Sequence, residues 1–501
     1  MDIDTLLSYE WSMMAPEFTI LLVATALSLI DLFASKNVDR KHFGWFGIGG
    51  IAVALIFLIS QIGHEPAMIL ANTYRLDAFS LSFKILLLLG SLLVLLMGVS
   101  FEAKGELTYR GEFYYLLLTA LLGAMMMASS ADLITLFVGL ELLTISSYIL
   151  AGTRKKSKYS NEAAMKYVIN GGISTAFTLF GMSYIYGLTG STNLADISRE
   201  ISNITPANGQ VLLSIAFILT FVGLAFKISS VPFQMWAPDV YQGAPTPVTA
   251  FLSVVSKTAG FIIIIRVLIS IFPFTQGFEE NTSLLHSLMI FLSILAGITM
   301  IVGNTIALKQ RNIKRLFAYS SIAHAGYLLV PFVAFSELMF ESMWFYLVAY
   351  LLMNIGAFAI IQVMTEHNDS EDVSIFAGLY YRRPWVAIMM TVFLLSLAGI
   401  PGTAGFIGKL NIFIGALFSD PSRYILAAVM IGTTVISYFY YFGIMAQMFM
   451  RPAGSATQVR LPIGVTITMV FCAVGTITLG LFPGVILEFF QTQFNFAEMF
   501  Y

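Results

Sequence analysis

Five ionisable side chains lie deep inside long apolar runs of the sequence: Glu141, Lys227, Lys257, His324 and Lys409. A charged group at the centre of a membrane helix costs roughly 2.5–3.5 kcal/mol, so the three lysines and the glutamate together forfeit stability on the order of 10 kcal/mol. A protein with no use for these groups would be more stable with leucine in their place. Because they can exchange protons, and because water can bridge the gaps between them, we predict proton or cation translocation.

Lys227 lies five residues before Pro232 in the segment FKISSVPFQMW. Proline lacks an N–H group and displaces the carbonyl four residues back, so the helix should open over residues 228–231. Opened backbone at membrane depth survives only where it faces protein or water. We predict that Glu141, in FVGLELLTISSYIL, acts on Lys227 as a switch, because a nearby carboxylate holds the lysine proton and its withdrawal releases it. A static ion pair is the alternative.

A second interrupted span, LAGIPGTAGFIGKLNIF, places Lys409 eight residues after Pro401. Four intact spans separate the two interrupted ones, which cross the membrane in opposite directions. This pattern is typical of inverted-topology repeats, whose broken helices carry ion sites at the membrane midplane. We therefore predict two five-helix repeats, spans 4–8 and 9–13, each with one helix broken at Pro232 or Pro401.

Two further residues are predicted to form a relay at the midplane. Lys257 follows Pro247 by ten residues, which is about 15 Å along a helix and about half the hydrocarbon thickness. Its side chain cannot easily reach the interface. His324, in YSSIAHAGYLL, lies about half-way along its span, and an imidazole suits a proton relay near neutral pH. A hydrogen-bonded histidine with a structural role is the alternative.

The remaining charged side chains of the apolar runs lie within a turn or two of a span end. Long stems let lysine and arginine reach the membrane interface from such positions. We therefore predict anchoring for the basic residues and interfacial positions for the acidic ones: Lys84, Lys166 and Arg266, and Glu17, Asp31 and Asp132.

The amino-acid composition indicates a membrane protein. Of the 501 residues, 58% are hydrophobic and only 11% are charged, whereas soluble domains average about 25% charged residues. The apolar runs should be helical, because lipid offers no water to unpaired backbone groups, and the alternating pattern of a β-barrel is absent. We predict an all-α integral membrane protein with about fourteen transmembrane helices.

The apolar segments divide the chain into four regions. We assign an N-terminal three-helix segment to 1–110, the first repeat to 111–275, the second repeat to 276–450 and a C-terminal span to 451–501. The predicted spans are 16–33, 44–62, 79–100, 113–130, 133–152, 163–188, 210–243 (interrupted), 246–271, 285–307, 316–335, 340–365, 386–418 (interrupted), 424–449 and 462–482.

The distribution of lysine and arginine predicts the orientation. Loops after odd-numbered spans carry most of the basic residues, among them Lys36 and Lys104. Loops after even-numbered spans hold only Arg75, Arg199 and Arg423. Because cytoplasmic loops are enriched in these residues, we predict that the odd loops are cytoplasmic and that both termini lie on the outer face. The N-terminal stretch lacks the basic region of a signal peptide, so the first span should be retained.

Several kinds of site are absent from the sequence. The net charge of −2 argues against a nucleic-acid partner. The single cysteine, Cys472, cannot build an iron–sulfur site, and we find no His/Cys metal-ligand spacing, glycine-rich phosphate loop or nucleophile–base arrangement. We therefore expect no bound cofactor or metal and no bond-making catalytic residue. Moving a charge against the membrane potential needs about 2.3 kcal/mol per 100 mV, so another component must supply the energy.

Several motifs carry a family resemblance that spans essentially the whole chain. FKISSVPFQMWAPDVYQGAPTPVTAFLSVVSKTAGF resembles the signature of the antiporter-like subunits of respiratory complex I, the proton-translocating NADH–quinone oxidoreductase. FVGLELLTISSYIL, RLFAYSSIAHAGY and the broken span ending in GFIGKL resemble the same family. Only about twenty residues follow the last predicted span, unlike the member with a long lateral C-terminal helix.

The resemblance implies a role for each of the five deep side chains. Glu141 matches the fifth-helix glutamate, Lys227 the seventh-helix lysine and Lys257 the eighth-helix lysine. His324 matches the tenth-helix position, and Lys409 the terminal lysine of the proton pathway.

The resemblance also implies a setting in the bacterial inner (plasma) membrane. The chain would be an enzyme only as part of the complex, whose NADH, FMN, iron–sulfur clusters and quinone are bound by other subunits. Its partners would be the antiporter-like subunit M, small membrane-arm subunits and lipids. Two alternatives remain: a stand-alone or Mrp-type antiporter that exchanges Na⁺ or K⁺ for H⁺, and a structural membrane scaffold with inert ion pairs.

Overall fold

The computed structural model describes residues 8–35, 38–101, 110–202, 206–272, 284–334, 339–419, 422–452 and 460–493, without the side chains of 206–208, 285 and 287. Lys36, Lys104, both chain ends and the predicted repeat boundary between 275 and 276 lie outside the described residues.

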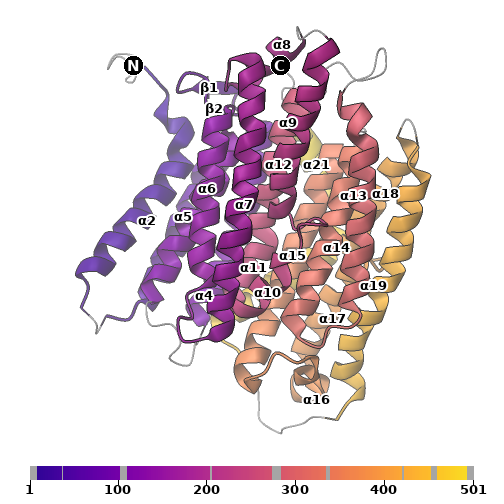
Figure 1. The fold of residues 1–501 in the computed structure, drawn as a ribbon. Helices are drawn as coiled ribbons and strands as arrows, with labels where there is room; N and C mark the ends of the chain where they lie inside the picture. The colour runs from indigo at the N-terminus through magenta and orange to yellow at the C-terminus, as the bar shows by residue number, and fades with distance from the viewer. Residues whose placement is uncertain are drawn as a thin grey trace.

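Helices make up nearly all of the described chain, arranged as one tall bundle (Figure 1). In chain order the elements are η1 (Trp11–Met14), α2 (Ala15–Phe33), α3 (Lys41–Ser60), β1 (Ala67–Ile69), β2 (Tyr74–Leu76), α4 (Ala78–Ser100), α5 (Arg110–Ser129), α6 (Leu133–Ala151), α7 (Lys158–Thr189), α8 (Leu194–Ser202), α9 (Pro206–Lys227), α10 (Trp236–Gly243), α11 (Thr246–Phe251), η2 (Leu252–Ser256), α12 (Lys257–Ile271), α13 (Leu284–Ala307), α14 (Ile313–Ala334), α15 (Met339–Asn368), η4 (Val373–Phe376), α16 (Leu379–Arg382), α17 (Pro384–Ala398), α18 (Ala404–Phe418), α19 (Tyr424–Met450), α20 (Ile463–Leu481) and α21 (Pro483–Gln493).

Within the described ranges, thirteen helices are long and apolar enough to cross a membrane. Two shorter apolar helices, α17 and α18, form the two halves of the interrupted segment predicted at 386–418. The predicted all-α membrane fold with about fourteen spans is therefore confirmed.

Both predicted helix breaks are present. α9 ends at Lys227 and α10 begins at Trp236, with Pro232 between them, while α17 ends at Ala398 and α18 begins at Ala404. In Figure 1, α9 lies above α10 but α17 lies below α18, so the two broken spans run in opposite directions, as predicted for inverted repeats.

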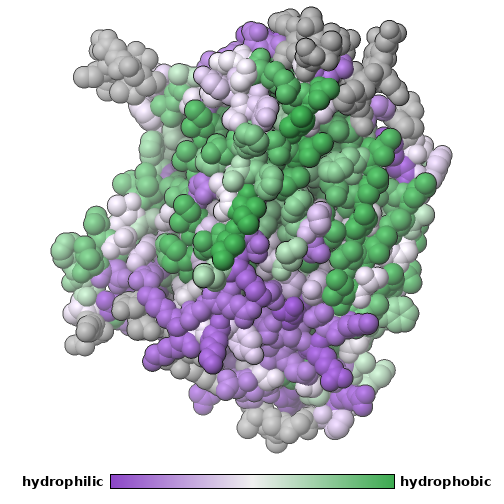
Figure 2. All heavy atoms as spheres, in the orientation of Figure 1, coloured by the Kyte–Doolittle hydropathy of each residue, from purple (hydrophilic) through white to green (hydrophobic). Residues whose placement is uncertain are grey.

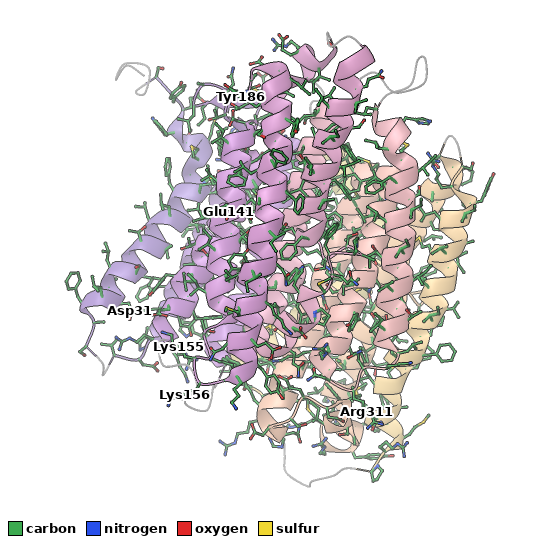
Figure 3. All side chains as sticks on the ribbon, viewed as in Figure 1. Asp31, Glu141, Lys155, Lys156, Tyr186 and Arg311 are labelled. Carbon is green, nitrogen blue, oxygen red and sulfur yellow. The ribbon has the colours of Figure 1, made fainter. Side chains whose placement is uncertain are left out.

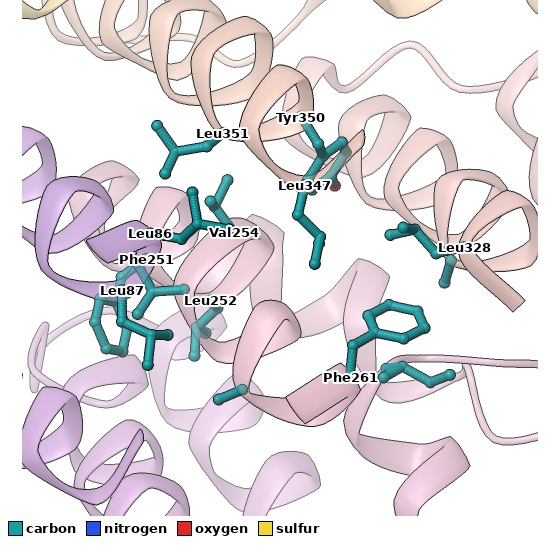
Figure 4. Close-up of a cluster of buried hydrophobic side chains, with 14 of the residues drawn as sticks. Leu86, Leu87, Phe251, Leu252, Val254, Phe261, Leu328, Leu347, Tyr350 and Leu351 are labelled. Carbon is teal, nitrogen blue, oxygen red and sulfur yellow. The ribbon is translucent and has the colours of Figure 1, made fainter. Parts of the chain in front are cut away.

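The innermost helices are α11, α12, α14 and α15. Nearly every residue of α15 from Met339 to Met364 is buried, as is almost all of α12 and α14. Figure 4 shows how their side chains interlock, with Leu86 of α4 packed among Phe251, Val254 and Leu351. A membrane helix that is buried all round can hold polar groups away from lipid, and these helices carry Lys257 and His324.

A backbone feature beside Lys257 was not predicted. The π-helical turn η2 joins α11 to α12 immediately before Lys257, where the sequence predicts a plain helix over 246–271. Turns of this kind are rare and occur often at functional sites.

The surface has the two zones of a membrane protein. Figure 2 shows a broad hydrophobic belt above a hydrophilic lower end. Basic residues mark that lower end, where Figure 3 labels Lys155, Lys156 and Arg311, and Tyr186 lies at the opposite end. Large apolar side chains such as Phe33 and Ile425 are each 84% exposed, as residues that face lipid would be.

The predicted interfacial anchoring of Lys84 and Arg266 is wrong. Lys84 is fully buried, with its Nζ 2.5 Å from Glu17 Oε1 and 2.9 Å from the Tyr74 hydroxyl. Arg266 is also buried and donates two hydrogen bonds of 2.8 Å to the Asp77 carboxylate. The hairpin of β1 and β2 and the start of α2 cover these span ends with protein, so the side chains meet carboxylates instead of the interface.

Of the three acidic residues and Lys166, two are buried by protein and two are partly exposed. Glu17, in the first turn of α2, and Asp132, the N-cap of α6, lie near span ends as predicted, but both are buried by protein. Asp31 is partly exposed beside Arg40 at 3.1 Å. Lys166 is partly exposed and contacts Asp239 at 2.6 Å, which agrees with a position near a span end.

Candidate functional site

The first broken span places Lys227 at the last residue of α9, where the helical hydrogen bonds stop. Its ammonium group is buried and donates to the hydroxyl oxygen of Thr144 on α6 at 3.2 Å. Its stem packs on α12: a Cβ added to Gly260 would lie 3.2 Å from Lys227 Cγ. Lys227 therefore lies beside the helix that begins with Lys257.

Glu141 lies one turn before Thr144 on α6 and does not form the direct ion pair with Lys227 that a static bridge requires. Its Oε1 accepts a hydrogen bond of 2.8 Å from the Thr175 hydroxyl on α7. The side chain is only partly buried, and Figure 3 shows it half-way up the membrane-facing surface. Thr144 thus links the lysine to α6, one turn from the carboxylate.

Lys257 lies at the centre of a cluster of hydroxyl groups. Its Nζ donates to the backbone oxygen of Ser321 at 2.5 Å and also contacts the Ser321 hydroxyl. That hydroxyl accepts a hydrogen bond from Tyr350 at 2.8 Å and lies 3.2 Å from the Tyr241 hydroxyl. Three helices, α10, α14 and α15, therefore meet at the ammonium group.

His324 occupies the next turn of α14 and is held by two phenols. Its Nδ1 lies 2.6 Å from the Tyr346 hydroxyl, and its Nε2 lies 3.3 Å from the Tyr441 hydroxyl. The Tyr441 hydroxyl lies 2.5 Å from the Ser320 hydroxyl. Both ring nitrogens have partners that can donate or accept, so the histidine can pass a proton in either tautomer.

The second broken span holds Lys409 one turn into α18, folded back on the break. Its Nζ donates to the backbone oxygens of Leu397 at 2.9 Å and Ala398 at 3.2 Å. These are carbonyls at the end of α17, which has no following turn to bond them. The Nζ also lies 4.9 Å from the centroid of the Tyr327 ring.

Together these contacts form a line through the centre of the bundle. The Tyr350 ring lies 5.2 Å from the His324 ring, and the Tyr327 ring lies 5.7 Å from it on the other side. Lys257, His324 and Lys409 are thus joined through tyrosines. Among the described residues, no hydrogen bond joins Lys227 to Lys257, so the line is interrupted there.

The sequence analysis missed the hydroxyl residues that connect the ionisable ones. Thr144, Tyr241 and Tyr441 each contact the site from a different helix. A signal was present for two others, since Tyr346 and Tyr350 are four residues apart and must share one face of α15.

A polar cavity of about 340 Å³ opens at the lower end of the bundle, and its lining includes Thr246 and Lys314. Lys314 is buried, with its Nζ 2.7 Å from Glu371 and 3.1 Å from the backbone oxygen of Ala244. Thr246 begins α11, so a helical rise of about 16 Å separates it from Lys257. The cavity thus opens a polar recess on the side of the bundle from which α11 leads to the buried lysine.

No group of three or more His, Cys, Asp or Glu side chains that could hold a metal ion occurs among the residues described. Cys472 is buried and free.

Gly399 offers a test of how Lys409 is held. It has φ of +82°, and a Cβ there would lie 2.9 Å from Lys409 Cδ. We expect Gly399→Ala to displace the lysine and lower the proton transport predicted from the sequence several-fold, roughly the effect of a 1 kcal/mol change. Gly402 is the matched control, because its φ of +89° imposes similar strain but a Cβ there meets nothing within 4 Å. Equal activity of the two variants, measured as vesicle acidification, would contradict this packing role.

Comparisons with known proteins place the chain in a family. The family described as "NADH:quinone oxidoreductase/Mrp antiporter, TM" matches residues 130–437. NADH-quinone oxidoreductase subunit N of Anoxybacillus flavithermus is 59% identical over 498 residues, which cover 99% of each chain. The subunit N of Geobacillus sp. (strain WCH70) is 61% identical over 493 residues, covering 98% of this chain and 100% of that one.

A solved structure of respiratory complex I from Thermus thermophilus contains a chain with the same fold. That chain is 32% identical, with a TM-score of 0.78, and the match covers 94% of this chain and 98% of that one. The sequence resemblance to antiporter-like subunits of complex I is therefore confirmed, and the chain belongs to the family of NADH-quinone oxidoreductase subunit N, a multi-pass membrane subunit of bacterial respiratory complex I.

Proposed function

We propose that this membrane-arm subunit moves protons through Glu141, Lys227, Lys257, His324 and Lys409, and that these groups act in this order along the bundle. The observation that supports the proposal most directly is the set of hydrogen-bond partners around the buried lysines. Among the described residues, the ammonium groups of Lys227, Lys257 and Lys409 donate hydrogen bonds to hydroxyl and carbonyl oxygens, and none of them pairs with a carboxylate.

The buried cations elsewhere in the described chain differ in this respect. Lys84 pairs with Glu17, Arg266 with Asp77, and Lys314 with Glu371. An ammonium group that loses its proton inside an ion pair leaves a buried carboxylate uncompensated, which is costly. Without a carboxylate partner, the three site lysines can give up and regain a proton without that penalty.

The switch begins with Glu141 and Lys227. Thr144 holds the ammonium group against α6, one turn from Glu141, and a shift of α6 relative to the opened end of α9 changes the distance between the carboxylate and the ammonium group. Approach of the carboxylate favours the protonated lysine, and withdrawal favours transfer towards Lys257.

From Lys257 the proton passes through the Ser321 and Tyr350 hydroxyls to His324, and then past Tyr327 to Lys409. Protons enter from the polar cavity beside Lys314, and Lys409 exchanges with the opposite face. The energy comes from partners, because NADH, FMN, iron–sulfur clusters and quinone are bound by other subunits of the complex.

The orientation and domain division follow the same proposal. The lower end, with Lys155, Lys156 and Arg311, faces the cytoplasm of a bacterial cell, and both chain ends face outward. Residues 111–275 and 276–450 form the two repeats between an N-terminal segment, 1–110, and a C-terminal span, 451–501. The neighbours in the membrane are the antiporter-like subunit M, small subunits and lipids.

Exchange of Na⁺ or K⁺ is the competing function, and the family description includes Mrp antiporters. Na⁺ is a hard cation that prefers several oxygen ligands including carboxylates. Along the described line of groups only Glu141 supplies a carboxylate, and the three lysines would repel a cation. The arrangement favours protons.

Removing the alkali cations tests this choice. NADH-driven acidification of sealed membrane vesicles holding the intact complex should be unchanged when Na⁺ and K⁺ are replaced by choline, since no step uses them. Loss of acidification in choline, or uptake of radioactive Na⁺ that stops with NADH depletion, would contradict a proton pathway and support the antiporter.

A further inference from the structure

An apolar groove lies on the outside of the second repeat, between α13 and α19. Its volume is about 550 Å³, and its floor and walls include Ile290, Ile294 and Ile301 of α13 and Leu426 of α19. Figure 2 shows hydrophobic side chains over this side of the bundle. At its upper end the groove meets Arg423, the residue directly before α19.

Arg423 differs from the other described arginines of the upper end. Arg75 lies 3.2 Å from Asp77, and Arg199 lies 3.4 Å from Asp196. No described carboxylate pairs with Arg423, and its Nε is buried without a hydrogen-bond partner. Its Nη2 reaches only the sulfur of Met289, at 3.3 Å. A half-buried guanidinium that lacks an anion is thus held at the mouth of an apolar groove.

The dimensions indicate what fills the groove. From Ile290 to Ile301 the helix rises about 16 Å, which is close to half of the roughly 30 Å hydrocarbon thickness. The groove therefore spans one leaflet from its rim inwards, the length of one acyl chain. A transmembrane helix of a partner is about 10 Å wide and would cross both leaflets.

We propose that this groove binds an anionic phospholipid of the leaflet at the upper end of the bundle, with its phosphate on Arg423 and one acyl chain along α13. Guanidinium groups bind phosphate through two parallel hydrogen bonds, and the half-buried Arg423 has no described carboxylate that would compete for its exposed edge. Ser422 and Tyr424, on either side of Arg423, line the same mouth and place further polar groups beside the headgroup.

Photolabelling of the intact complex tests the site. The complex is reconstituted with phosphatidylglycerol that carries a diazirine in one acyl chain, and labelled peptides are identified after irradiation. We expect label on residues 290–301 and 424–429, with at least several-fold less when phosphatidylcholine carries the diazirine. Arg423→Gln should lower phosphatidylglycerol labelling about tenfold, because it removes a charge-assisted bond to phosphate.

Two further variants make the result decisive. Arg199→Gln is the matched control, since it removes an arginine from the same end of the bundle outside the groove, and it should leave the labelling unchanged. Gly297→Trp should fill the groove and abolish labelling by blocking the acyl chain, because a Cβ at Gly297 meets only Leu426, at 3.9 Å. This variant decides the question if the Arg423 variant does not assemble.

Three results would overturn the proposal. Equal labelling by both lipids would show that no anionic headgroup is selected. Wild-type labelling of Arg423→Gln, or of Gly297→Trp, would place the lipid elsewhere. Cross-linking of the groove to another subunit, without lipid label, would assign this face to a protein partner.

Discussion

Replacing Lys257 by leucine is expected to slow NADH-driven proton translocation roughly a hundredfold, while the complex still assembles. The Lys257 ammonium group lies between Lys227 and the Ser321 and Tyr350 hydroxyls that lead to His324. Without it a proton must cross an apolar stretch unaided, and a charge at the membrane centre costs about 2.5–3.5 kcal/mol. The measurement is acidification of sealed vesicles driven by NADH.

An arginine at position 257 distinguishes a proton-relay role of Lys257 from a purely structural role of its positive charge. Lys257→Arg keeps the positive charge, but a guanidinium group does not release its proton in a protein. A relay therefore stays blocked in Lys257→Arg, whereas a structural role for the charge would be restored. Normal pumping by the arginine variant would count against the role we give Lys257.

Replacing Glu141 by glutamine is expected to slow translocation about tenfold. Glutamine has nearly the same shape and can still accept the hydrogen bond that Thr175 donates to Glu141, so the fold of α6 and α7 should be unaffected. What is lost is the negative charge that favours a proton on Lys227. The initial rate of vesicle acidification at fixed NADH oxidation is the quantity to compare.

The control for this variant is Glu162→Gln on the adjacent helix α7. Glu162 is largely exposed and lies beside Lys166, outside the line of site groups. Its variant should pump at the wild-type rate. If Glu141→Gln also pumps at that rate in a fully assembled complex, the switch between Glu141 and Lys227 must be abandoned.

The sequence predicted the backbone of the site because that backbone depends on local rules. Proline removes a donor and displaces a carbonyl wherever it stands in a helix, so the openings at Pro232 and Pro401 follow from a few residues each. The repeat direction follows from the same two breaks and the span count. The π turn before Lys257 has no such local signature and was missed.

Partners of the buried charges were harder to predict, because they come from distant parts of the chain. Lys84 and Arg266 look like interfacial anchors when only their distance from a span end is known. Tertiary contacts supply Glu17 and Asp77, both from segments that fold over the upper end. The same limit applies to Glu141, which lies near Lys227 but bonds to Thr175.

The tyrosines of the site show a third limit on what could be predicted from the sequence. They are abundant in this sequence, with 22 in all, and most lie where any aromatic residue would pack. Tyr327 follows His324 by three residues and shares its helix face, but only the packing of α14 against α15 and α19 singles out Tyr350 and Tyr441 as neighbours of His324. Hydroxyl groups complete the line between the lysines, and their placement is a property of the whole bundle.

The most direct test of the pathway is the number of protons moved per NADH oxidised, measured with both quantities in the same sealed vesicles. Lys409→Leu removes the last site lysine, and Lys155→Leu is the same change at an exposed loop residue at the lower end. The account predicts that the assembled Lys409→Leu complex moves fewer protons per NADH and that Lys155→Leu equals wild type. An assembled Lys409→Leu complex with the wild-type ratio would contradict it.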